Sequence, residues 1–103
     1  MKKIFLKNFG GIYLNGREEG RSAFLALEKE IASLDSEQKL FIDCSEIAVL
    51  APSWCDEFFG EAEEKHSGIM VVDDRIHEGF RKSFNVVAES RKISFLFGSF
   101  AEK

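Results

Sequence analysis

The chain has few of the residues that cross-link or interrupt a small fold, with two cysteines and one proline among 103 residues. Two cysteines cannot build the disulfide framework of a small secreted domain, so we expect a reducing, cytoplasmic location. The lone proline and the lack of a Ser/Gly-rich tract leave no position for a linker. We therefore expect a single domain over residues 1–103.

Basic charge and long apolar runs are also scarce. The chain has 14 Lys and Arg against 18 Asp and Glu, so its formal net charge of −4 lacks the basic excess of a nucleic-acid-binding domain. No stretch approaches the roughly 20 apolar residues of a membrane helix. The apolar run behind Lys2 and Lys3 covers only residues 4–6, against about 7–15 in a signal peptide. We expect no signal peptide, and neither nucleic acid nor a membrane as partner.

Phenylalanine, by contrast, occurs eleven times and supplies much of the apolar area that a small core needs. Apolar runs alternate with segments of helical periodicity, an order typical of α/β domains. Gly10 and Gly11 favour a two-residue hairpin turn between the first two strands. We expect one α/β domain with a mixed β-sheet and amphipathic helices packed mainly on one side. Strands are expected at residues 3–7, 12–14, 40–42, 69–72 and 93–97, a further apolar run at 47–50, and helices at 17–34, 53–67 and 74–85.

The central helix carries the clearest pattern in the chain. Ser53 is a favourable N-cap residue, and Asp56 three positions later suits the free N–H groups of a first helical turn. The helical period gathers apolar side chains on one stripe, which we expect to face the core. The members of this stripe are Trp54, Cys55, Phe58, Phe59 and Ala62.

Cys44, Cys55, His66 and His77 are residue types that zinc prefers, but their spacing does not suit one ion. Successive members are separated by ten residues, whereas structural zinc sites use pairs about two to five residues apart. Cys55 and His66 would lie roughly 16 Å apart along one helix. We expect core thiols and surface histidines, with no metal or other cofactor. A nucleophilic Cys55 is the weaker alternative, because no histidine has a reason to approach it.

The charged residues near these helices leave two interpretations open. Asp56 and Glu57, with Glu61, have the chemistry of general acid–base catalysts, but adjacent acids on an outer helix face are normally only solvated. Arg17 belongs to a charged helix start at residues 17–21 without the glycine-rich loop of a phosphate cradle. Two interpretations of this segment remain. Its acidic residues stabilise the helix N-terminus by interacting with the helix dipole, or Arg17 makes a polar contact near Ser53.

Ser53 is the strongest functional candidate, beyond its expected role as N-cap. A phosphate on its hydroxyl would meet the free N–H groups of a helix N-terminus, so the folded state would tolerate it. Phosphorylation would add about −1.5 to −2 charges to a neutral surface. The sequence therefore predicts a phosphorylation site at Ser53 with a large electrostatic effect and little refolding.

The order of elements resembles that of the STAS domain (sulfate transporter and anti-sigma factor antagonist). Residues 40–47 are similar to the family's Asp-bearing strand, and Ser53 lies at the position of its phosphorylatable serine. Ala51 and Pro52 stand where the family has Asp and Ser. The nearer resemblance is to a STAS-like family of unknown function, whose serine–aromatic–acidic signature is similar to residues 52–60.

The resemblance implies a non-enzymatic regulatory module that binds a protein partner, such as a histidine-kinase-type ATPase. Its recognition face would comprise Ser53, Asp56, Glu57 and Arg17. Phosphorylation at Ser53 would control the binding of the partner. Two alternatives stay open. The domain is a structural or adaptor module without a switch, or, less favoured, a small enzyme that uses Asp56 and Glu57.

Overall fold

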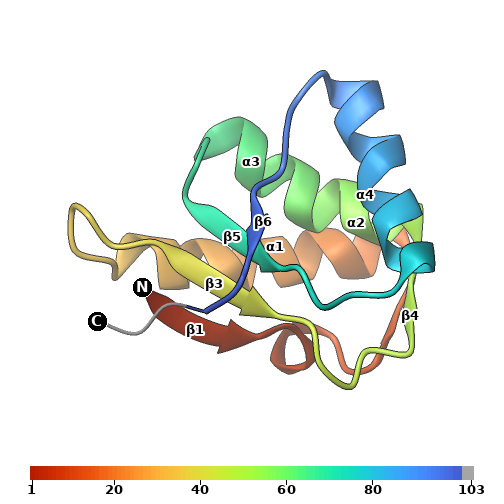
Figure 1. The fold of residues 1–103 in the computed structure, drawn as a ribbon, viewed down its shortest axis with the longest axis horizontal. Coiled ribbons are helices and arrows are strands. Elements are labelled where there is room, and N and C mark those ends of the chain that lie inside the picture. The colour runs from red at the N-terminus through yellow and green to blue at the C-terminus, as the bar shows by residue number, and fades with distance from the viewer. Residues whose placement is uncertain (101–103) are drawn as a thin grey trace.

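Four strands form one sheet in the computed structural model, which describes residues 1–100 (Figure 1). Their spatial order, β1-β3-β5-β6, follows the order of the chain, and every neighbouring pair is parallel. The expectation of a mixed sheet is therefore wrong. The strands are β1 (Lys2–Phe5), β3 (Leu40–Asp43), β5 (Met70–Asp73) and β6 (Phe97–Gly98); β2 (Tyr13–Leu14) and β4 (Val49–Leu50) form a separate parallel pair.

Each connection between neighbouring strands of the sheet contains a helix, as parallel strands require a crossover. The second connection holds one continuous helical segment whose middle turn is a π turn. The helical elements are the 3₁₀ turn η1 (Leu6–Phe9), α1 (Arg17–Ala32), α2 (Pro52–Cys55), the π turn η2 (Asp56–Gly60), α3 (Glu61–Lys65) and α4 (Glu78–Arg91).

The helices cover one face of the sheet (Figure 1). Alternate strand residues, such as Ile42 and Val72, point to this face and join the buried cluster that the helices complete. Phe41 points to the other face and is also fully buried. The C-terminal segment covers it there, with the rings of Phe41 and Phe100 centred 5.5 Å apart.

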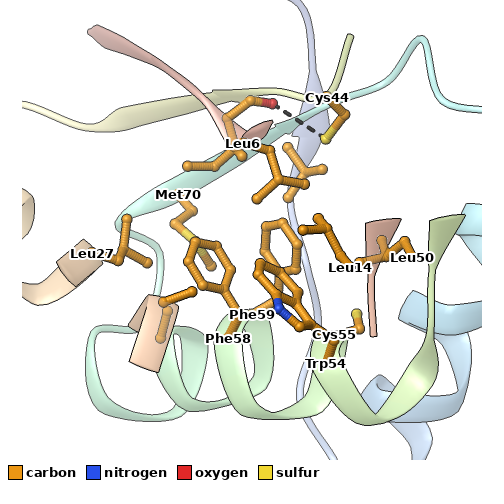
Figure 2. Packing of buried hydrophobic residues seen from close by; sticks show 14 of the residues in the cluster. Leu6, Leu14, Leu27, Cys44, Leu50, Trp54, Cys55, Phe58, Phe59 and Met70 are labelled. Atoms are coloured by element: carbon orange, nitrogen blue, oxygen red, sulfur yellow. Dashed lines mark hydrogen bonds between the residues drawn. The ribbon is translucent and has the colours of Figure 1, made fainter. Parts of the chain in front are cut away.

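The core is built around the aromatic residues of the α2–η2 segment, as the apolar stripe predicts. Trp54, Phe58 and Phe59 are at most 1% exposed. The rings of Trp54 and Phe58 stack with centroids 4.7 Å apart, and those of Phe58 and Phe59 meet edge-on at 4.8 Å. Figure 2 shows all three pointing from the helix toward Leu6 and Met70 on the sheet side.

The expected hairpin at Gly10 and Gly11 is wrong. β1 ends at Phe5, where the chain enters the 3₁₀ turn η1 and buries Leu6 completely. This turn leads the chain away from β1, so β1 pairs with β3 and β2 pairs with β4. Gly11 still has a positive φ of 81°, but it follows the 3₁₀ turn, and its N–H donates to the carbonyl of Lys7.

The last helix is longer than expected. The sequence favours a stop at Asn85, but α4 continues to Arg91, and Lys92 adopts the left-handed conformation instead. His77 caps the start of α4, because its Nδ1 accepts a hydrogen bond from the N–H of Gly79 at 3.1 Å. The final strand, expected over residues 93–97, covers only Phe97–Gly98.

Candidate functional site

The fold brings the predicted recognition residues together at the start of the central helical segment. Arg17 is the first residue of α1, and Asp56 and Glu57 open the π turn η2. The Nη1 atom of Arg17 lies 2.7 Å from Oδ2 of Asp56 and 3.2 Å from Oε2 of Glu57. Of the two interpretations that the sequence leaves open for Arg17, the structure shows the polar contact near Ser53.

Ser53 lies in a small hollow beside this ion pair. The hollow has a volume of about 100 Å³, below the about 300–1,000 Å³ of sites that enclose cofactors or metabolites. It suits a single side chain or a group as small as a phosphoryl. The lining residues come from α1, α2, η2 and α4: Arg17, Pro52, Ser53, Asp56, Val86, Val87 and Ser90.

Ser53 is not the N-cap, which corrects the sequence-based expectation. Pro52 is the first helical residue, and Ala51, with an extended backbone, takes the cap position. Proline is favoured at a first helical position because its fixed φ suits the helix and its missing N–H would have no partner there. Ser53 is therefore the second helical residue, half-buried, and its hydroxyl is not used for capping.

Arg91 is the residue of this site that the sequence does not reveal. From the end of α4 its Nε donates to Oδ1 of Asp56 at 2.7 Å, and its Nη1 donates to Oε2 of Glu61 at 2.9 Å. The same Nη1 lies 3.5 Å from Oε2 of Glu64. The side chain is only 14% exposed, and its hydrogen bonds connect α4 to the π turn. The sequence does not reveal this role, because the expected helix end at Asn85 would leave Arg91 outside the helix.

The two arginines hold Asp56 as a carboxylate. Hydrogen bonds from Arg91 lower the pKa of Asp56; burial opposes this effect, and the bond from Arg17 adds to it. The same bonds raise the pKa values of Arg91 and Arg17 above the ordinary range. A general acid needs a pKa raised toward neutrality. Asp56 is therefore the anion of an ion-pair network and is not suited to be a proton donor.

Two glycines let the helices approach closely enough to form this network. A Cβ on Gly20 of α1 would lie 2.8 Å from the carbonyl oxygen of Trp54. A Cβ on Gly60 of η2 would lie 2.6 Å from Nε of Arg91. The central helical segment is thus in close contact with α1 on one side and α4 on the other.

The cysteines and histidines lie in separate places. Cys44 and Cys55 are buried free thiols; burial, with the nearby Asp73 and Asp43, raises the pKa of Cys44 to about 12, and burial raises that of Cys55 further. His66 lies 3.1 Å from a carboxylate oxygen of Glu28, and the second histidine caps α4. Within residues 1–100, no three of these residue types and acids are grouped to hold a metal.

The carboxyl edge of the sheet carries two buried aspartates on neighbouring strands. Asp43 accepts the N–H of Ser45, and Asp73 accepts both the N–H and the guanidinium of Arg75. Burial would raise the pKa of Asp73, but the bonds from Arg75 outweigh it and the pKa is lowered. The strand order does not reverse within this sheet, so the edge has no topological switch point, where open α/β sheets hold their ligands.

Comparison with known proteins finds no matching family model, no similar curated protein and no similar solved structure. The STAS-like resemblance therefore stays a prediction from the sequence. Within residues 1–100, no helix combines the length and the apolar character needed to cross a bilayer.

Proposed function

We propose that this chain is a STAS-like, non-enzymatic protein-interaction module that works in the cytoplasm without a cofactor. Its recognition face is the surface formed by Ser53, Asp56, Glu57 and Arg17. The observation that carries the proposal is that Ser53 and Arg17 line one hollow, although Arg17 belongs to another helix.

This arrangement gives a phosphate on Ser53 a defined effect. Arg17 is 61% exposed and makes its ion pairs with Asp56 and Glu57 at the rim of the hollow. A phosphate adds about −1.5 to −2 charges and three strong acceptors, so it would compete for this guanidinium. It would also repel Asp56 in the next helical turn. Phosphorylation would therefore change the charge pattern of the face without a change of fold.

The partner is a regulatory protein, with a histidine-kinase-type ATPase as the first candidate. The face presents the exposed guanidinium of Arg17 beside the neutral hydroxyl of Ser53, which favours a partner with an acidic group at this point. Added negative charge at Ser53 would repel such a group. An acid–base enzyme is not supported, because the lowered pKa of Asp56 keeps its carboxylate ionised and bound to arginine.

The first experiment is intact-mass analysis of the protein purified from its native cells. We expect a fraction heavier by one phosphate, and we expect it to be absent in Ser53→Ala. In the second, a histidine-kinase-type ATPase from the same cells is titrated against wild type, Ser53→Asp and Ser67→Asp. Ser67 is exposed beyond the end of α3, so it controls for added charge.

We expect Ser53→Asp to weaken this binding by at least about tenfold with unchanged melting, and Ser67→Asp to bind like wild type. Equal binding by all three proteins would contradict the switch. The domain would then be an adaptor without control at Ser53.

A further inference from the structure

A groove separate from the Ser53 hollow runs between β1 and α1. Two adjoining hollows of about 450 and 360 Å³ share Asn8, Phe9 and Ala26 in their linings, so they form one continuous depression. Both volumes fall within the about 300–1,000 Å³ of ligand sites. We call this depression the β1–α1 groove.

One wall of the β1–α1 groove is an open sheet edge. β1 is the terminal strand of its sheet and pairs only with β3. The N–H of Lys2 donates to the carbonyl of Lys39, toward β3. Because backbone groups alternate along a strand, the N–H groups of Lys3 and Phe5 point away from β3, toward the free edge. Such an edge is a template for an added strand.

The floor and the opposite wall are shaped to admit a backbone. Three small residues of α1 line the groove, so the helix leaves space beside the strand: Ser22, Ala23 and Ala26. Phe9 forms part of the floor, and its ring is fixed against Phe58 with centroids 5.6 Å apart. Phe5 remains 38% exposed at the rim. These surfaces would cover the apolar side chains of an added segment.

The charges at the two ends of the β1–α1 groove differ in sign. Glu18 and Glu19 line the end next to the start of α1. Lys29, which is exposed, lines the other end, and Glu30 beside it is ion-paired with Lys2 at 2.8 Å. We propose that the β1–α1 groove binds an extended, apolar segment of a partner protein, which adds to β1 as a strand. Its acidic residue lies at the lysine end and its basic residue at the glutamate end.

A second copy of this chain is the less suitable occupant. β1 and the residue pair after it carry Lys2, Lys3 and Lys7. Pairing of two such edges would bring like charges together, which destabilises cross-strand neighbours. Lysines on an edge strand are a common means of preventing this self-association.

The test uses fluorescent peptides of about eight residues, of which four lie beside the four residues of β1 and two at each end reach the charged ends of the β1–α1 groove. One peptide carries two acidic residues, four alternating valines and threonines, and two lysines; the second has the reverse order, because the strand adds either parallel or antiparallel. We expect one of the two to bind the full chain in fluorescence anisotropy. Methylation of its backbone nitrogens removes the edge hydrogen bonds, so it should weaken binding by at least about tenfold.

Matched variants locate the site. Ala26→Arg places a long side chain in the β1–α1 groove and should weaken binding by at least about tenfold, whereas Leu25→Arg, one residue earlier at a 52% exposed position outside its lining, should not. Ser53→Asp should bind the peptide like wild type, which separates this proposal from the function proposed above. All variants are first checked by thermal melting.

Any one of four results would overturn the proposal. The first is that neither peptide binds more tightly than a scrambled peptide of the same composition. The second is that Ala26→Arg leaves binding unchanged, and the third is that backbone methylation leaves it unchanged. A dimer in analytical ultracentrifugation that Ala26→Arg dissociates would also overturn it, because a second copy would then occupy the edge.

Discussion

The guanidinium of Arg91 lies against the backbone of Gly60, in the space where any other residue would place its Cβ. From there it reaches Oδ1 of Asp56 at 2.7 Å. A residue near the end of the last helix thus holds a carboxylate that opens the π turn. The arrangement of the proposed recognition face depends on this contact as well as on its own exposed residues.

The contact predicts an acid-dependent loss of stability. The pKa of Asp56 in the folded protein lies below its unfolded value of about 3.9, so its stabilising contribution is fully present above that pH and is lost as pH falls through the folded pKa. We expect Asp56→Asn to be less stable than wild type at pH 7 by about 1–2 kcal/mol. The difference should narrow as pH falls below the unfolded pKa of about 3.9 and through the lowered pKa of the folded protein.

Denaturant unfolding at a series of pH values measures this difference. Asp35→Asn, at an exposed loop position, is the control and should follow the wild-type curve. If the difference in unfolding free energy between wild type and Asp56→Asn does not change with pH, the charge of the Asp56 carboxylate does not stabilise the fold.

Gly20 predicts an exception to helix propensity. Alanine in place of a helical glycine normally stabilises by about 0.5–1 kcal/mol. At Gly20 the new Cβ would lie 2.8 Å from backbone oxygen of Trp54, which cannot move aside. We expect Gly20→Ala to lose about 1–3 kcal/mol in urea unfolding, as overpacked sites do. Ser22→Ala, exposed in the same helix, should be nearly neutral; a stabilised Gly20→Ala would contradict the close approach of α1 and α2.

Ser53 and His77 form a matched pair that separates capping from recognition. Ser53→Ala should change stability by less than about 0.5 kcal/mol, because Ser53 makes no capping bond. His77→Ala removes the acceptor for the N–H of Gly79 and should cost about 0.5–2 kcal/mol. Thermal melting of both variants tests the assignment. The opposite ranking would restore Ser53 as the cap.

Phe58 should be one of the most sensitive positions in the chain. It is fully buried and in ring contact with Trp54, Phe59 and Phe9. Phe58→Ala should cost about 3–5 kcal/mol in denaturant unfolding. Leu25→Ala, at an exposed position of α1, should be close to neutral. A mild effect at Phe58 would indicate a loosely packed core.

The thiols should be unreactive in the folded protein. Burial and two nearby aspartates raise the pKa of Cys44 to about 12, and burial raises that of Cys55 further, so the thiolate is rare at neutral pH. We expect iodoacetamide to modify neither residue at pH 8 over a time in which both react in guanidinium chloride. Mass spectrometry of both samples reports the result, and rapid alkylation of the native protein would disprove the buried placement.

Local patterns in the sequence predict the approximate positions of the helices and the apolar stripe of the central helix, but they leave open whether Arg17 approaches Ser53. They fail where the outcome depends on distant parts of the chain. Gly10 and Gly11 have the chemistry of a hairpin, but the pairing of β1 with β3 is decided by burial of Ile4 and Ile42 across some forty residues. No local signal encodes that choice.

Arg91 and Ser53 illustrate the same limit at the site. Asn85 is a suitable helix end by composition, but packing of Val87 in the core continues α4 and brings Arg91 to Asp56. The cap position was predictable, because Pro52 is favoured at a first helical position and moves the cap to Ala51. The ion-pair network required knowledge of how three helices cross.

The π turn at residues 56–60 is the place where this helical segment can change its length. The N–H of Glu61 donates to the carbonyl of Asp56, five residues earlier, so this turn holds one residue more than an α-helical turn. Removal of one residue here would close the segment as a regular α-helix and leave Ala62 and the rest of α3 on the face that Trp54 and Phe58 share. The same deletion in α1 or α4 would instead rotate every later residue of the helix by about 100°.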